Sequence, residues 1–129
     1  MGNSQLFSEF YPGDSYVDMV VISSFNRANT DQWHQGWHTF AEDFRPAYDQ
    51  VAAFTAKPLG VGEMGTTSYG GNKPEWIAQA FQSIIDEFPR VEQVTWFLEN
   101  KQAGDIMLDW DLNTASDKAA FTQGCACHR

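Results

Sequence analysis

The stretch that decides the predicted fold is Lys57-Pro-Leu-Gly-Val-Gly-Glu-Met-Gly65. Leu59 and Val61 suit a short strand that is covered on both faces, and such strands are typical of parallel sheets. The strand ends by presenting a single carboxylate, Glu63, between glycines that let backbone or ligand approach closely. This pattern predicts a nucleophile, and the alternative is a loop carboxylate that caps a neighbouring element.

Helical and strand patterns alternate on both sides of this stretch. Strands are predicted at residues 16–23, 57–65 and 91–98, and a short segment is noted at 106–110. Helices are predicted from a capping box at Thr39, with Pro46 opening a second helical piece, then from Pro74 to Pro89, and finally near residues 116–121. The alternation predicts an α/β fold of right-handed βαβ units around a parallel sheet.

Length and composition narrow the class of protein. The 129 residues suffice for one domain, predicted at 1–124, but are about half of what a closed (β/α)8 barrel needs. With 43% apolar and 15% aromatic residues the chain should fold, while a net charge of −9 argues against nucleic-acid or anionic-membrane partners. No apolar run reaches the ~20 residues of a membrane span, and the start lacks a signal-peptide pattern.

Metal ligands are sparse in the sequence. Cys125, Cys127 and His128 form an incomplete zinc set, so residues 125–129 are predicted as a disordered tail. His34 and His38 lie four residues apart, but the intervening Gly36 and nearby tryptophans indicate a loop. No phosphate-binding or dinucleotide-binding motif occurs, and we predict no metal and no cofactor.

The carboxyl ends of the predicted strands carry the residues of a sugar site. In parallel sheets the functional residues lie at these ends, which here are residues 24–26, 63–64 and 96–100. Aromatic rings stack on the C–H faces of sugars while carboxylates and amides bind hydroxyl groups. The candidate aromatic residues are Trp33, Trp37, Tyr69, Trp96 and Trp110, and each of them could instead pack in the core.

The order of several motifs resembles the last third of the catalytic barrel of glycoside hydrolase family 26, which contains β-mannanases and some β-1,3-1,4-glucanases. The resemblance covers residues 11–121. It rests on YPGDSYVDMVVIS, F-x-E-x-F-x-P-x-Y at 40–48, KPLGVGEMGTT, GGNKPEWI, FPRVEQVTWF and the DWDL region. These motifs resemble the sixth to eighth strand-helix units, so the resemblance implies a partial (β/α)8 barrel.

That resemblance also implies roles for individual residues. Glu63 would be the nucleophile of a retaining endo-β-1,4-mannanase, and Trp96 would line the subsite of bond cleavage. Trp33 or Trp37 would contact the sugar chain through the long loop, and Phe25, Asn26 and Tyr69 complete the expected substrate-binding set. The implied substrates are β-mannan or mixed-linkage glucan, and the implied location is extracellular.

Two departures from the family pattern bear on activity. The acid/base glutamate of the family lies on the fourth barrel strand, which has no counterpart in this sequence. Glu99 lies at the next strand end and is the candidate to replace it, but a glutamate in such a position is usually a solvated or capping residue. Phe25 stands where the family usually carries a tyrosine that hydrogen-bonds the nucleophile, and loss of that donor should raise the pKa of the carboxyl group. Arg27 could compensate electrostatically, or simply be an exposed loop residue.

Three readings therefore remain open from the sequence. The chain is a hydrolase whose acid comes from elsewhere, a non-catalytic carbohydrate-binding or structural remnant, or an unrelated small α/β domain. A three-stranded parallel sheet would leave both edges unpaired, so we expect a homo-oligomer, a partner chain or a rearranged fold to cover them.

Overall fold

The computed structural model describes residues 6–30 and 36–127. It contains two short 3-10 turns, three helices and five strands within these ranges. In chain order the elements are η1 (Phe7–Glu9), η2 (Asp14–Tyr16), β1 (Val20–Asn26), α1 (Phe40–Phe54), β2 (Leu59–Thr66), α2 (Lys73–Glu87), β3 (Val91–Trp96), β4 (Lys101–Ala103), β5 (Ile106–Leu108) and α3 (Ala115–Cys127).

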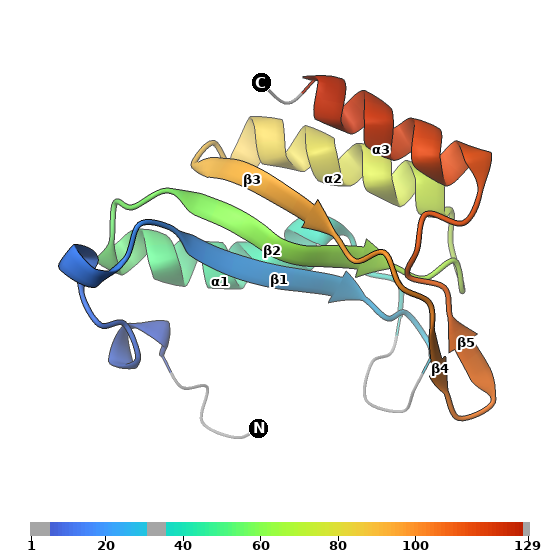
Figure 1. Cartoon of the computed structure of the whole chain (residues 1–129), viewed down its shortest axis with the longest axis horizontal. Coiled ribbons are helices and arrows are strands. Elements are labelled where there is room, and N and C mark those ends of the chain that lie inside the picture. The colour runs from blue at the N-terminus through green and yellow to red at the C-terminus, as the bar shows by residue number, and fades with distance from the viewer. Residues whose placement is uncertain (1–5, 31–35, 128–129) are drawn as a thin grey trace.

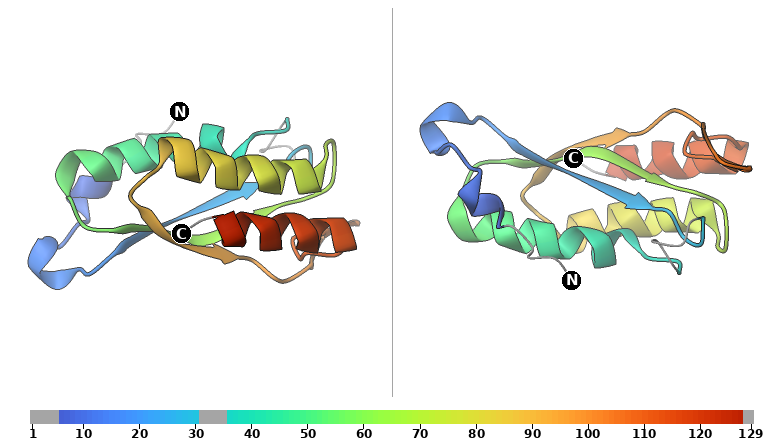
Figure 2. Two further views of the ribbon diagram at one scale, coloured as in Figure 1. Left: turned by 90° about the horizontal axis from the view of Figure 1, so that it is seen from above. Right: turned by 90° about the horizontal axis from the view of Figure 1, so that it is seen from below.

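The three long strands form one parallel sheet in the order β1-β2-β3, which confirms the predicted α/β class. Their carboxyl ends point the same way, toward the small antiparallel hairpin of β4 and β5 (Figure 1). Helices α1 and α2 lie along one side of the sheet (Figure 2), and α3 packs on α2, where the Phe81 and Phe121 rings are 5.6 Å apart. Residues on the other side, such as Val21 and Gln93, are exposed.

Side-chain caps fix where the helices begin. The Thr39 side chain accepts a hydrogen bond from the Glu42 amide, while the Glu42 carboxylate accepts one from the Thr39 amide, so the predicted capping box is confirmed. Asn72 caps α2 through the Glu75 amide in the same way, satisfying an amide that the helix itself leaves unpaired.

Pro46 does not start a second helical piece, because α1 runs through it without a break. A proline inside a helix removes the hydrogen bond to the carbonyl four residues earlier, which here belongs to Glu42. Both Pro46 and Glu42 are exposed, so water can satisfy that carbonyl. The buried positions of α1 then continue at helical spacing across the proline as Phe40, Phe44, Tyr48 and Val51.

The hydrophobic core lies between the sheet and the helices. Leu59, Val61 and Met64 of β2 are fully buried there, below two stacked phenylalanines of α1, Phe40 and Phe44, whose ring centroids are 4.7 Å apart. Most of the large apolar residues of α2 are buried, among them Trp76, Ile77 and Ile84, but Ile85 is 43% exposed. Burial of this continuous apolar layer is the main stabilising term expected for the domain.

Several predicted boundaries differ from the structure. Tyr16 ends a 3-10 turn rather than starting a strand, and β1 begins only at Val20. The strand at 101–103 was not predicted and pairs with β5 as a hairpin. Helix α3 is longer than expected and continues to Cys127, so three of the five residues predicted as a disordered tail are helical. Within the described ranges, no helix is both long and apolar enough to cross a membrane.

Candidate functional site

A bulge in the central strand determines where Glu63 points. Val61 pairs with Ile22 and Val94, and Met64 pairs with Ser24 and Trp96. Between these pairs β2 advances by three residues, while β1 and β3 each advance by two. The extra residue shifts the alternation of side chains. Val61 and Met64 therefore both face the core, and Glu63 between them is exposed on the side of the sheet away from α1 and α2.

Glu63 lines a pocket of about 270 Å³ at the carboxyl end of the sheet. The other lining residues come from the ends of β1 and β3, from β4 and from the segment after β5: Phe25, Arg27, Phe97, Lys101 and Trp110. The volume lies near the lower end of the ~300–1,000 Å³ usual for small-molecule sites. It suits one sugar residue rather than a long stretch of polysaccharide.

Three aromatic rings form the apolar part of the pocket. Phe25 lies edge-on to both Trp110 and Phe97, with centroid separations of 5.2 and 5.8 Å. Phe25 and Phe97 are partly buried, whereas Trp110 is only 3% exposed and forms the packed base of the pocket. Edge-to-face packing of this kind holds aromatic rings at defined angles.

Two cations flank the rings. The Arg27 guanidinium carbon lies 5.7 Å from the Trp110 ring centre, and Lys101 Nζ lies 5.5 Å from that of Phe97. Both distances permit cation–π attraction. Within the described residues, no hydrogen bond or ion pair engages the Glu63 carboxylate, so its oxygens are available to a ligand.

The structure places the expected site residues in different environments. Phe25 lies in the Glu63 pocket, as expected for a residue at this strand end. Asn26 does not, because it is fully buried: its Nδ2 donates to Thr66 Oγ1 at 2.9 Å and its Oδ1 accepts from the His38 amide at 3.1 Å. Asn26 thus ties the loop before α1 to β2, and its binding of substrate stays a prediction.

Trp96 does not line the Glu63 pocket either. Its side chain is 5% exposed and packs in the core against Trp76 and Phe121, with ring centroids 6.1 and 5.9 Å away. The alternation of side chains along β3 explains this position, because Trp96 pairs with the core-facing Met64. Its indole N–H donates to the Trp110 carbonyl oxygen at 2.7 Å, so Trp96 contacts the backbone of a pocket residue without lining the pocket.

Trp37 and Tyr69 lie outside the Glu63 pocket. Trp37 is partly buried and packs so closely over Gly71 that a Cβ there would lie 2.5 Å from its indole carbons. Tyr69 is 41% exposed and donates from its hydroxyl group to the Met107 carbonyl oxygen at 2.6 Å. Trp33, also expected to bind substrate, lies outside the described residues.

The described part of the pocket contains one carboxylate. Glu99 is exposed and lies 3.8 Å from Lys101 Nζ, and it does not line the pocket. The described residues contain no cluster of three or more potential metal ligands. His38 Nδ1 lies 3.8 Å from the Glu42 carboxylate, and His34 is outside the described ranges.

The sequence argument missed Phe97 and Lys101 as pocket residues and treated Arg27 and Trp110 as secondary candidates. Phe97 directly follows a predicted strand end, and that position could have identified it. Lys101 belongs to β4 and Trp110 follows β5, and the position of this hairpin at the carboxyl end of the sheet has no local sequence signal beyond its turn glycine, Gly104 at φ +60°.

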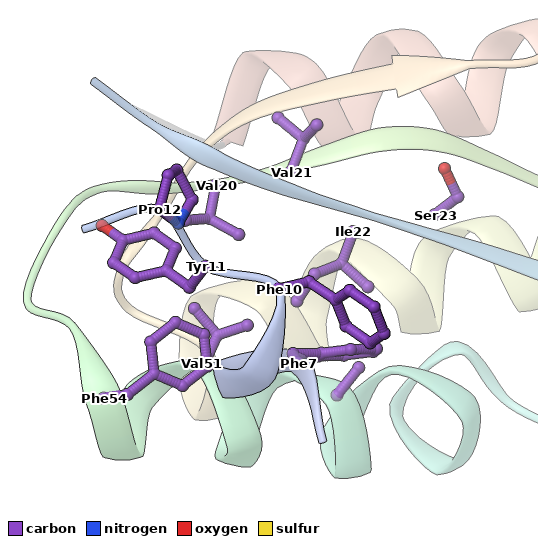
Figure 3. Close-up of a pocket in the computed structure, with 11 residues that line it drawn as sticks. Phe7, Phe10, Tyr11, Pro12, Val20, Val21, Ile22, Ser23, Val51 and Phe54 are labelled. Carbon is purple, nitrogen blue, oxygen red and sulfur yellow. The ribbon is translucent and has the colours of Figure 1, made fainter. Parts of the chain in front are cut away.

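A second cavity, of about 440 Å³, lies at the other end of β1 and is apolar. Figure 3 shows Phe7, Phe10 and Tyr11 of the N-terminal segment gathered with Val51 and Phe54 of α1, while Val21 points to the opposite side of β1 from Ile22. Its lining lacks carboxylates and amides that could bind sugar hydroxyl groups. The Glu63 pocket is therefore the better candidate for a polar ligand.

One known protein shows a clear similarity in sequence. The chain is 34% identical over 120 residues to endoglucanase H of Acetivibrio thermocellus. The match covers 93% of this chain but 13% of that protein, so the chain spans only a small part of the length of this relative. No family model matches the chain.

Proposed function

We propose that this chain is the carboxyl-terminal part of a glycoside hydrolase-like domain that acts on a β-linked polysaccharide, with Glu63 as its nucleophile. The observation that carries the proposal is the bulge that turns Glu63 out of the core into an aromatic-lined pocket. Similarity to an endoglucanase supports a polysaccharide substrate. The three βα units are compatible with the sixth to eighth units of a (β/α)8 barrel of glycoside hydrolase family 26.

In this reaction the Glu63 carboxylate attacks the anomeric carbon, and the bond from that carbon to the leaving oxygen breaks. The leaving oxygen must take a proton from an acid, and retaining enzymes place that acid about 5–5.5 Å from the nucleophile. No second carboxylate among the described residues lines the pocket. The proton donor is thus proposed to come from another chain or from further barrel units.

The name of the matched relative favours a β-glucan as the first substrate to test. β-Mannan, which the family resemblance implies, is the second. Both polymers have pyranose faces made of axial C–H bonds that can stack on aromatic rings, so the rings of Phe25 and Phe97 suit either one.

A substrate that needs no acid separates the nucleophile from its missing partner. A dinitrophenyl β-cellobioside has a leaving group that departs without protonation, so Glu63 alone should release about one dinitrophenolate per chain and retain the sugar covalently. Mass spectrometry of the digested protein should locate this adduct on the peptide that contains Glu63. The corresponding mannobioside tests the other substrate.

Two variants with the same change in charge provide the control. Glu63→Gln should abolish both the burst and the adduct, whereas Glu99→Gln should leave both unchanged because Glu99 is exposed and does not line the pocket. A burst that survives in Glu63→Gln would refute the assignment of the nucleophile.

A non-catalytic sugar-binding role is the second candidate, favoured by the single carboxylate in the pocket. It predicts that cello- or manno-oligosaccharides bind to the wild-type chain and that neither aryl glycoside forms an adduct. Titration calorimetry with both oligosaccharides, run beside the adduct assay, distinguishes the two functions.

A further inference from the structure

The three residues that carry the base of the pocket, Asp109, Trp110 and Asp111, are held by their backbone carbonyl oxygens. We call these residues the strap. Lys73 Nζ donates to the Asp109 carbonyl and, at 2.6 Å, to that of Asp111. The indole N–H of Trp96 donates to the Trp110 carbonyl between them, at 2.7 Å. All three consecutive carbonyl oxygens of the strap therefore accept a hydrogen bond from a buried side chain.

Burying the ammonium group of Lys73 at this position costs stability. Its side chain is 2% exposed, although an ammonium group loses much of its hydration energy on burial. It is also the first residue of α2, where the helix dipole disfavours a positive charge. The charge is compensated locally by the two strap carbonyls and by the Asp117 carboxylate at 4.0 Å.

The strap determines where the Trp110 ring lies. With the carbonyls anchored toward α2 and the core, the ring lies on the uncovered side of β2, 5.2 Å from the Phe25 centroid and within reach of Arg27. The ring thereby contributes the base of the pocket that Glu63 lines. The same ring would lose its defined position if the strap were free to shift.

We propose that Lys73 and Trp96 are positioning residues that hold Trp110 beside Glu63 and so shape the sugar site. This inference rests on the proposed function where it concerns sugar binding, but the positioning of Trp110 can be measured without any sugar. Neither residue touches the pocket, and each acts through the strap.

The test uses two variants that remove the donors. Lys73→Met removes the ammonium group, and Trp96→Phe removes the indole N–H while keeping an aromatic ring. Lys73→Arg retains a buried cation with several donors and should partly rescue. Lys118→Met, at an exposed lysine of α3, controls for loss of one positive charge.

The first readout is the indole N–H signal of Trp110 in a nitrogen-15 correlation spectrum, assigned with Trp110→Phe. Lys73→Met and Trp96→Phe should both shift this signal in folded protein, while Lys118→Met should not. If Lys73→Met does not fold, Trp96→Phe still tests the proposal. An unchanged Trp110 signal in folded Trp96→Phe, or in folded Lys73→Met, would overturn it, because a merely structural lysine would lower stability without moving this ring.

The second readout is binding of a cello-oligosaccharide, measured by calorimetry at a temperature where every variant is folded. Misplacing a wall of the site by about 1 Å should weaken binding by roughly 10- to 100-fold in Lys73→Met, and by less in Lys73→Arg. Wild-type affinity in a folded Lys73→Met with a shifted Trp110 signal would overturn the link to the sugar site. If wild-type protein binds no sugar while the Trp110 signal responds as expected, the proposed function fails and the positioning role stands.

Discussion

Gly65 and Trp110 are in contact across the uncovered side of the sheet. A Cβ atom built on Gly65 would lie 3.3 Å from Cε3 of Trp110 and 3.4 Å from Cδ1 of Phe25. Glycine is thus the residue that allows the indole ring to rest directly on β2, two positions after Glu63. This close approach gives the pocket its packed base.

Gly65→Ala is expected to push the Trp110 ring outward by a few tenths of an ångström and to weaken binding of cello-oligosaccharides. Gly60→Ala is the matched control on the same strand, because its nearest neighbours, Met19 Sδ at 3.1 Å and Val21 Cγ1 at 3.2 Å, are side-chain ends that can move. Calorimetry of both variants should show weaker binding for Gly65→Ala alone, and equal effects would contradict the contact argument.

Asn26→Ala is expected to lower the free energy of unfolding by about 1–3 kcal/mol, since it removes two buried hydrogen bonds, to Thr66 and from the His38 amide. Urea denaturation measures this loss. Asn29→Ala, which removes an exposed acceptor for the Gly36 amide, should cost much less. Sugar affinity of folded Asn26→Ala should equal that of wild type if Asn26 is only structural, and a selective loss of affinity would support the predicted substrate-binding role of Asn26.

The buried position of Lys73 makes stability depend on pH at the alkaline side. Desolvation lowers the pKa of Lys73, partly opposed by the nearby carboxylates of Asp109, Asp117 and Asp111. Between this lowered pKa and the ordinary lysine value of about 10.4, the unfolded chain binds more protons than the folded one. The free energy of unfolding of wild type, relative to Lys73→Met, should therefore rise with pH across that window. Urea denaturation of both proteins at several alkaline pH values checks the sign, and a falling difference would contradict it.

Gly124 permits α3 to dock on α2, because a Cβ there would lie 2.1 Å from Cδ2 of Phe81. Alanine is the better helix former by about 1 kcal/mol, yet Gly124→Ala should destabilise the protein by about 1–3 kcal/mol through overpacking. Combining it with Phe81→Leu should recover part of that loss. A double-mutant cycle by thermal unfolding measures the coupling, and strictly additive effects would argue against this contact.

The sequence by itself determined the elements whose signals are local. The Thr39 capping box, the Asn72–Pro74 start of α2 and the alternation of strands with helices each involve neighbouring residues, and all were recovered. The sequence also indicated that Glu63, near a strand end and flanked by glycines, is a candidate functional residue. Glycines at such a position indicate that another group approaches the backbone closely.

Only the tertiary structure decided which side chains meet at Glu63. A strand pattern without a bulge would place Glu63 on the same face as Val61, and pairing with both neighbours is what shifts it to the uncovered side. Trp96 and Trp110 are equivalent candidates in the sequence, yet one packs in the core and the other forms the base of the pocket. This difference depends on which side of the sheet each position of β3 faces. It also depends on hydrogen bonds from Lys73 and Trp96 to the strap, which is 14 or more residues away in the sequence. Contacts of such separation form only when the sheet and helices have assembled, so no local pattern encodes them.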